Sequence, residues 1–194
     1  MTPDERPRCW WPDGIERADP LMLRYHDTEW GVPVEEDRDL FERIALESFQ
    51  AGLAWVTILR KREAFRLAFG GFDPATVASY GDADRARLLA DSTIVRNRAK
   101  IDATIGNASA FLAVSAEHGG FAAYMADRLP RPSPTLAAGA TWADVPASTD
   151  ESDTLSADLR RRGFRFVGST IVYALMQSVG LVDDHLPGCF RYRG

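Results

Sequence analysis

The sequence of 194 residues has only two cysteines, and it has no long hydrophobic run. Its longest apolar stretch, residues 51–59, is far shorter than the about 20 residues that a membrane-spanning helix needs. The first residues show neither the basic segment nor the apolar segment of a signal peptide. We therefore expect a cytoplasmic protein that does not contact membranes, and in that compartment a disulfide between the two cysteines is not expected.

A basic excess is missing as well. The chain has 23 lysines and arginines against 28 acidic residues, for a net charge of −5, whereas nucleic-acid-binding domains usually carry a positive excess. The basic residues are nevertheless clustered in three places, at 60–62, 96–100 and 160–165. Such clusters form either one basic face suited to DNA or several separate solvated helix faces, and the composition leaves both open.

Alternating patterns typical of β-strands are rare, whereas helical spacing of apolar residues is common. It occurs in six segments, at 37–50, 54–69, 83–90, 97–116, 153–162 and 169–179. The last segment is apolar almost all round, which predicts a buried helix. The proline-rich residues 130–135 are typical of a loop between two helical regions. With no internal repeat, the sequence predicts an all-α protein with a single domain over residues 1–194.

One carboxylate lies on the apolar side of the predicted helix 37–50. At about 100° per residue, Leu40, Ile44 and Ala51 fall within about 40° of one another, and Glu47 falls among them. A carboxylate in that place must be paired with a cation, protonated or reserved for a ligand, because an unpaired buried charge is very costly. The sequence leaves open a buried salt bridge and a ligand-binding carboxylate with a perturbed pKa.

The two cysteines and two of the three histidines come from opposite ends of the chain. Cys9 is followed by His26, and His185 lies four residues before Cys189, a spacing that resembles half of a tetrahedral zinc site. Four sulfur and nitrogen ligands leave no open position, so such a metal would be structural and would join the two chain ends. The gap between Cys9 and His26 matches no standard zinc finger, and two unrelated buried thiols with two ordinary histidines are the alternative.

A second helical feature is the segment 160–174, which predicts a helix, a short turn with two glycines and a buried helix. Gly163 and Gly168 permit a tight turn and a close approach of the backbone. The N–H groups of Ser169 and Thr170 would then point outward, where they can bind an anion such as a DNA phosphate. A plain hairpin of two helices is the alternative.

Together these segments resemble the DNA-3-methyladenine glycosylase I family, which is part of the helix-hairpin-helix DNA glycosylase superfamily. The matching stretches occur in the family's order, at residues 8–9, 25–33, 46–55, 96–101, 162–168 and 180–189. The resemblance implies an all-α glycosylase fold with a helix-hairpin-helix at about 153–180. It also implies a monomeric, monofunctional base-excision-repair hydrolase. Such an enzyme releases N3-methyladenine from alkylated double-stranded DNA and leaves an abasic site.

The resemblance assigns roles to individual residues. The residues that match the family's ligands for one structural Zn²⁺ are Cys9, His26, His185 and Cys189. Glu47 matches the catalytic-site carboxylate that hydrogen-bonds the excised base. Tyr25 and Trp55 match the pocket aromatics that stack on the base. Trp30 and Gln50 match further positions of the pocket wall. The residues implied in DNA binding are Leu53, which would fill the gap left by the flipped nucleotide, and the hairpin residues Gly163, Val167, Gly168, Ser169 and Thr170.

The sequence also departs from the family, at Met22, Ser48 and Val56, and the first two bear on the shape of the pocket. Other superfamily members carry a catalytic aspartate near Asp183 and Asp184. The resemblance does not transfer that role, so we expect Asp184 to be a structural neighbour of the metal ligands. Two alternatives remain open: a zinc-stapled helical DNA-binding module without activity, and a glycosylase that also accepts other alkylated purines such as 3-methylguanine.

Overall fold

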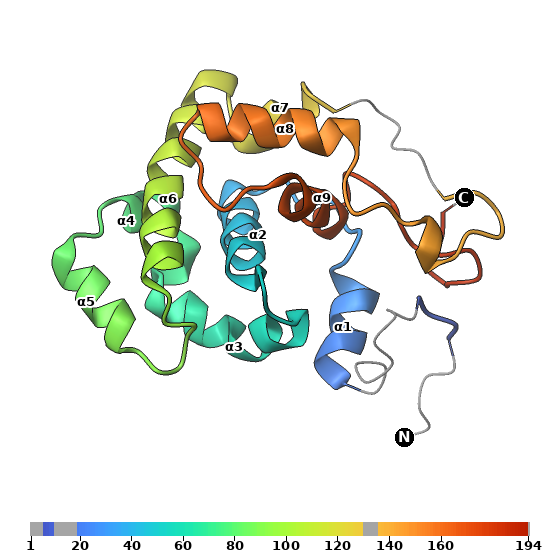
Figure 1. Cartoon of the computed structure of the whole chain (residues 1–194), viewed down its shortest axis with the longest axis horizontal. Helices are drawn as coiled ribbons and strands as arrows, with labels where there is room; N and C mark the ends of the chain where they lie inside the picture. Colours follow the sequence, from blue (N-terminus) through green and yellow to red (C-terminus); the bar gives the residue numbers. More distant parts are fainter. Residues whose placement is uncertain (1–5, 10–18, 130–135, 194) are drawn as a thin grey trace.

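The computed structural model describes residues 6–9, 19–129 and 136–193, so the loop predicted at 130–135 lies outside the described residues. Within these three ranges the chain is helical and contains no β-strand, which confirms the predicted all-α class. Figure 1 shows the helices arranged around a central pair, α2 and α9. No helix in the described ranges is long and apolar enough to cross a membrane.

The described residues form nine α-helices and two short 3₁₀ helices. Their bounds are α1 Pro20–Thr28, α2 Asp37–Gln50, α3 Trp55–Ala68, η2 Gly70–Phe72, α4 Pro74–Ala78, α5 Asp82–Ala90, α6 Arg98–His118, α7 Phe121–Ala126, η3 Trp142–Asp144, α8 Asp150–Arg161 and α9 Ser169–Ser178.

All six helices predicted from apolar spacing are present, as α2, α3, α5, α6, α8 and α9, with ends that agree within three residues. The prediction missed α1, α4 and α7, which have nine, five and six residues. Helices α4 and α7 contain too few turns to show a period. Two of the three missed helices had a local signal, because Asp19 and Asp73 each cap a helix whose first residue is proline.

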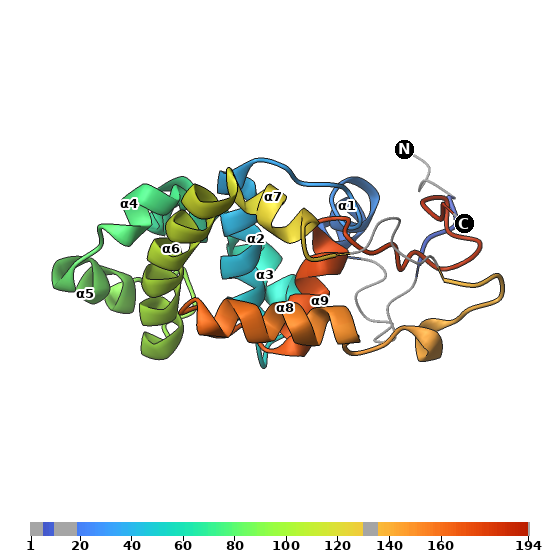
Figure 2. The same ribbon diagram turned by 90° about the horizontal axis from the view of Figure 1, so that it is seen from above.

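The main core surrounds α2, which packs against α3, α6, α7 and α9. Aromatic rings fill the space between these helices, and the phenylalanines with no exposed surface are Phe41, Phe49, Phe65, Phe69, Phe72, Phe111 and Phe121. Burial of a side chain of this size contributes about 1.5–3 kcal/mol. Helix α9 is largely buried, as its apolar sequence predicted, and it packs between α8 and α2 (Figures 1 and 2). The core therefore holds α2 in a fixed position at the centre of the molecule.

A second, smaller cluster joins the two ends of the chain beside α1. Its buried residues are Cys9, Tyr25, Trp30 and Cys189. The backbone N–H of Phe190 donates to the carbonyl of Pro7 at 2.8 Å, so the first and last described segments run side by side (Figure 1). Gly180 follows α9 with φ of +70°, and a Cβ there would lie 2.7 Å from the nitrogen of Pro33. Only glycine therefore allows the end of α9 to pack so closely against the segment after α1.

Candidate functional site

Glu47 is buried in the last turns of α2, with 4 % of its surface exposed. Its carboxylate has no hydrogen bond or ion pair with any described residue. Burial raises the pKa of Glu47 to about 8, although the positive charge of Arg43 acts in the opposite direction. Of the alternatives that the sequence left open, the buried salt bridge is therefore excluded among the described residues.

The ring of Tyr25 lies close to this carboxylate and packs against the ring of Trp55. Tyr25 from α1 and Trp55 from the start of α3 have ring centroids 5.3 Å apart. The charge of Glu47 contributes to raising the pKa of Tyr25, after burial, so the two side chains are close. The indole Nε1 of Trp55 is buried and has no hydrogen-bond partner in the described part of the chain. Tyr25 thus lies close to both Glu47 and Trp55, two of the other residues that the resemblance assigned to the base pocket.

Tyr25 also lines a cavity of about 410 Å³ between α1 and α3. Its other lining residues are mostly polar or charged and include Arg24, Glu29, Arg62 and Arg66, whereas Glu47 is not among them. This cavity therefore does not provide the contact to the Glu47 carboxylate that base recognition needs.

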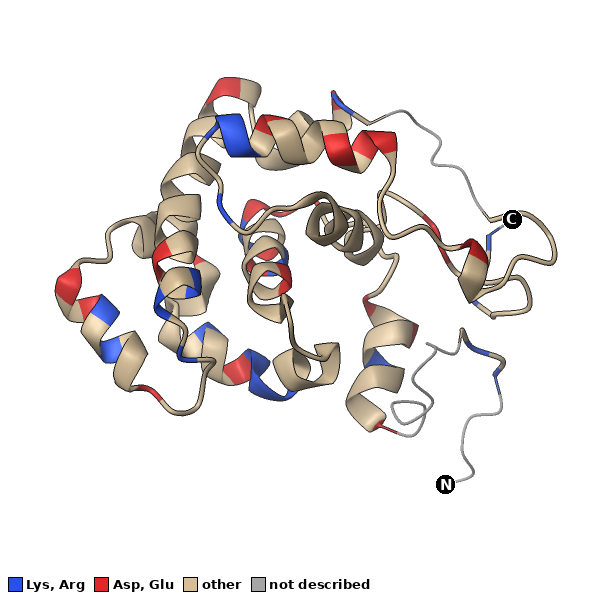
Figure 3. Cartoon of the chain, in the orientation of Figure 1, with Lys and Arg blue, Asp and Glu red and all other residues tan. Residues whose placement is uncertain are grey.

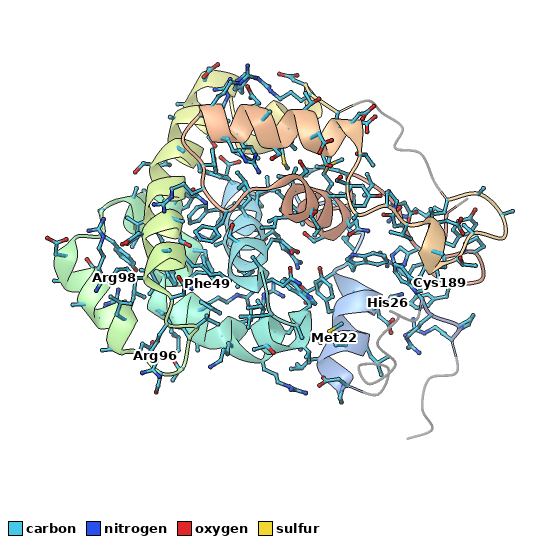
Figure 4. The ribbon with its side chains drawn as sticks, viewed as in Figure 1. Met22, His26, Phe49, Arg96, Arg98 and Cys189 are labelled. Atoms are coloured by element: carbon cyan, nitrogen blue, oxygen red, sulfur yellow. The ribbon has the colours of Figure 1, made fainter. Side chains whose placement is uncertain are left out.

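The other predicted pocket residues have contacts of their own. Trp30 is buried and packs edge-on against His185, with ring centroids 4.6 Å apart, so it supports the cysteine–histidine cluster. Gln50 donates from Nε2 to the carbonyl of Leu53 at 3.2 Å and holds the turn between α2 and α3. Ser48 donates to the carbonyl of Phe166 at 3.1 Å, so it ties α2 to the turn before α9. Met22 is buried in α1 (Figure 4).

The four predicted metal ligands form one buried cluster. The atoms that Cys9, His26, His185 and Cys189 offer to a metal all lie within 4.8 Å of one another. The Cys9 sulfur lies 3.4 Å from Nδ1 of His185, and the Cys189 sulfur lies 3.4 Å from Nε2 of His26 and 3.7 Å from Nδ1 of His185. In a tetrahedral zinc site, sulfur and nitrogen ligands are about 3.6 Å apart. Figure 4 shows His26 and Cys189 next to each other, and the geometry fits a tetrahedral metal ion.

In each histidine, the ring nitrogen that faces away from the cysteine sulfurs has a polar partner, as is usual for metal-binding histidines. Nδ1 of His26 lies 2.8 Å from a carboxylate oxygen of Asp27, which Arg8 also binds, and Nε2 of His185 lies 3.3 Å from the carbonyl of Trp30. Such partners fix the ring orientation of a ligating imidazole. Both sulfurs receive backbone N–H groups, from Leu186 and Arg191.

The ionisation of the cluster also suits a cation. Burial lowers the pKa of both imidazoles, that of His185 to about 4, so they are neutral and able to bind a metal. Burial raises the pKa of the Cys9 thiol, so the thiolate form needs a nearby positive charge. The site can therefore hold a cation with two sulfur and two nitrogen ligands.

The hairpin between α8 and α9 has the predicted turn. Gly163 has φ of +95°, a conformation that favours glycine, whereas Gly168 has an ordinary φ of −64° and serves as the N-cap of α9. No side chain caps this end of α9, and Ser169 and Thr170 in its first turn are partly or fully exposed. Val167 is buried and its carbonyl accepts from Ser156, so any contact of Val167 with DNA would have to be through its N–H group.

Helix α6 contacts both the hairpin and the end of α2. Asn107 on α6 exchanges hydrogen bonds with the backbone of Arg165, and Lys100 at the start of α6 donates to the carbonyls of Phe49 and Ala51 at the end of α2. The latter contact fixes the turn that carries Leu53, whose side chain is 38 % exposed. Figure 2 shows this turn and the hairpin at the same side of the molecule.

Charge is spread unevenly over these elements. Figure 3 shows acidic residues at the start of α8 and basic residues at its end, whereas α9 carries none. Arg96 and Arg98, at the start of α6, are exposed and lie far from His26 and Cys189 in Figure 4. The hairpin and the start of α6 thus each carry exposed basic residues, and other arginines, such as Arg8 and Arg191, lie at the cysteine–histidine cluster.

Asp184 accepts hydrogen bonds from the hydroxyl of Tyr173 and from Nε2 of Gln177, both at 2.7 Å. These contacts connect the end of the chain to α9. Asp183 accepts from the backbone N–H of His185 at 3.2 Å. Both aspartates therefore support the segment that carries His185 and Cys189 of the cysteine–histidine cluster.

These features define a helical protein with a buried, ring-lined carboxylate, a helical hairpin and a cysteine–histidine cluster. Residues 15–192 match the family model described as methyladenine glycosylase. The chain belongs to this family.

Curated relatives support this assignment. The chain is 45% identical over 187 residues to DNA-3-methyladenine glycosylase 1 of Escherichia coli (strain K12), which covers 96% of this chain and 97% of that protein. It is 41% identical over 182 residues to a DNA-3-methyladenine glycosylase of Haemophilus influenzae, which covers 94% of this chain and 96% of that protein.

Solved structures are similar over the same length. A crystal structure of 3-methyladenine DNA glycosylase I has a TM-score of 0.89 and 45% identity, covering 96% of this chain and all of that one. The enzyme from Staphylococcus aureus, whose structure describes the recognition of 3-methyladenine, has a TM-score of 0.86 and 34% identity, covering 91% and 94% of the two chains. The expected fold and family are therefore confirmed.

Proposed function

We propose that this protein is a DNA glycosylase of base excision repair that hydrolyses the N-glycosidic bond of N3-methyladenine in alkylated double-stranded DNA. The products are the free base and an abasic site. The proposal is supported by the family and by relatives named for this activity. In this proposal the protein acts as a monomer.

The observation that carries the proposal is the unpaired carboxylate of Glu47 beside Tyr25 and Trp55. Adenine methylated at N3 in DNA is cationic, whereas normal adenine is neutral. An anionic group in a buried, ring-lined place favours the cationic base, and aromatic faces attract a cation more strongly when water is excluded. The same arrangement has no evident use in a module that only binds phosphates.

The reaction requires that the damaged base leave the helix. Extrusion costs a few kcal/mol and is easier for a damaged base. Leu53, exposed on its fixed turn, would fill the gap, while the N–H groups at the start of α9 would hold a backbone phosphate. Tyr25 and Trp55 would stack on the extruded base, and Glu47 would accept from its exocyclic amine. Because the methylated base departs as a neutral molecule, its bond is already weakened, and water is the expected nucleophile.

Chromatography of the bases released from methylated DNA tests this proposal. We expect the wild-type protein to release 3-methyladenine, and Glu47→Gln to fold but to release much less. Glu63→Gln, an exposed carboxylate on α3, is the matched control and should behave as the wild type. DNA binding without base release would favour the inactive DNA-binding module, and equal release of 3-methylguanine would favour a wider substrate range.

The proposal includes one structural Zn²⁺ held by Cys9, His26, His185 and Cys189. When bound, the ion would balance the two thiolates and tie the chain ends together. We expect Cys189→Ser to lose the metal and to melt at a lower temperature, with activity lost only as a consequence. Elemental analysis and a melting curve test this order. A wild-type protein that is folded and active without any bound metal would contradict it.

A further inference from the structure

Arg43 is a buried arginine on α2 that the proposed function does not yet use. It lies one helical turn before Glu47, and 6 % of its surface is exposed. Residues four apart on a helix lie on the same face, about 5–6 Å apart at Cβ. The guanidinium therefore belongs to the same buried region as the carboxylate.

The contacts of Arg43 occupy only part of its guanidinium. Nη2 donates to Glu29 at 2.7 Å, and the group lies over the ring of Tyr25, 5.6 Å from its centroid. Nη1 is buried and has no hydrogen-bond partner in the described ranges. A buried donor without a partner destabilises the folded protein, so this arrangement calls for an explanation beyond stability.

Other charged groups around Glu47 are few. Helices α7 and α9 have no lysine, arginine, aspartate or glutamate, and the hydroxyl of Tyr173 on α9 is bonded to Asp184. From α6, Lys100 is bonded to the carbonyls at the end of α2, and from α3, Arg62 is bonded to Glu29 and Glu42. Tyr25 from α1 is uncharged. Besides burial, Arg43 is the one described group with a resolved effect on Glu47.

We propose that Arg43 is a positioning residue that supplies the counter-charge for Glu47, so that this carboxylate ionises more readily when the damaged base binds. This inference rests on the proposed function. Glu29 neutralises Arg43 on its far side, so the group of Glu29, Arg43 and Glu47 carries a net charge of −1 when all three are ionised. The region therefore still attracts a cationic base, although it contains a buried arginine.

The charge of Arg43 matters because burial works against Glu47. With a pKa of about 8, only a minor fraction of Glu47 is ionised in the empty site at neutral pH. Removal of the neighbouring cation would raise this pKa further. Base binding at neutral pH would then weaken, and binding at higher pH would not.

The test measures binding of 3-methyladenine by calorimetry between pH 7 and 10; the free base is neutral in this range, so the measurement reports the hydrogen bond from its exocyclic amine to the ionised carboxylate of Glu47. In Arg43→Met the charge is removed, while Glu29 keeps its ion pair with Arg62, so the protein should fold. We expect binding about tenfold weaker than in the wild type at pH 7, with the gap closing by about pH 10. Arg43→Lys keeps the charge and should restore most of the affinity at pH 7.

A matched control is Arg128→Met. Arg128 also lies over a tyrosine, 4.1 Å from the centroid of Tyr124, and also pairs with a carboxylate, Asp158, which keeps Arg162 as a partner. This variant should bind as the wild type at every pH. In a Glu47→Gln background, Arg43→Met should have no further effect on binding, because the group on which Arg43 acts is gone.

The outcomes separate the two proposals. If Arg43→Met binds as the wild type at pH 7, or if its defect is the same at every pH, Arg43 does not act through the charge of Glu47 and the inference is overturned. If Glu47→Gln itself binds 3-methyladenine as well as the wild type, the role of Glu47 in the proposed function fails instead.

Discussion

Helix α2 carries two buried carboxylates, five residues apart, in two different surroundings. Glu42 and Glu47 each have 4 % of their surface exposed. Glu42 accepts hydrogen bonds from Arg62 and Arg66, which come from α3. Glu47 has no partner among the described residues, and aromatic rings lie next to it.

The difference separates a structural carboxylate from one available to a ligand. A buried ion pair can offset most of the cost of burying its charges, whereas a lone buried carboxylate must be protonated or remain destabilising. The helix thus contains a site that lowers stability unless something else binds there. Such sites are expected where a protein recognises a polar or cationic ligand.

The largest expected effect is the pH dependence that Glu47 adds to stability. Its pKa is raised from 4.5 to about 8 on folding, so the folded state holds a proton that the unfolded state has lost. The contribution of Glu47 to the unfolding free energy is therefore fully present below pH 4.5 and is lost as the pH rises to 8. The total loss is at most roughly 5 kcal/mol. Denaturant unfolding of wild type and Glu47→Gln at pH 5, 6.5 and 8 measures it.

In this comparison Glu47→Gln is the reference, because glutamine has the same shape and does not titrate. We expect the difference in unfolding free energy, Glu47→Gln minus wild type, to increase as the pH rises from 5 to 8. Other titrating groups are common to both proteins and cancel in the difference. A difference that does not change with pH would show that Glu47 is solvated or paired, and the contrast with Glu42 would disappear.

Glu42→Gln should have the opposite consequences. It removes the acceptor of Arg62 and Arg66, and breaking a buried ion pair costs about 3 kcal/mol or more. We expect the melting temperature to fall by about 10 °C, while binding of 3-methyladenine at low temperature stays within a few-fold of the wild type. Glu63→Gln removes the exposed partner of Arg66 and should cost less than about 1 kcal/mol. A Glu42→Gln variant of normal stability that fails to bind would reverse the roles of the two carboxylates.

Local sequence patterns explain why much of the fold was predictable. The helices of nine residues or more in the core have enough turns for an apolar face to be visible, and α2 was predicted with its observed ends. Helix α1 was missed, although the cap Asp19 and the first residue Pro20 mark its start. The pairing of Glu42 with α3 was not predictable, because it depends on how two helices cross.

The candidate site was predictable to a different extent. Periodicity singled out Glu47, whereas spacing named the four members of the cysteine–histidine cluster but left the metal undecided, and the family resemblance assigned them as ligands. Arg43 was overlooked, although it falls on the same helix face as Leu40, Ile44 and Glu47. Its proximity to Glu47 was thus readable from the sequence, but its unused Nη1 and its position over Tyr25 required the tertiary structure.

The smallest of these effects concerns the indole N–H of Trp55, which is buried in this region and, like Nη1 of Arg43, has no partner among the described residues. Trp55→Phe keeps an aromatic face for stacking and removes only the donor and part of the ring. If the N–H donates to the extruded base, loss of one hydrogen bond should weaken binding of 3-methyladenine by about 3–10-fold, which calorimetry at pH 8 can measure. Unchanged affinity would mean that Trp55 contributes through its ring face alone, and that Glu47 is the only unpaired polar group here that serves recognition.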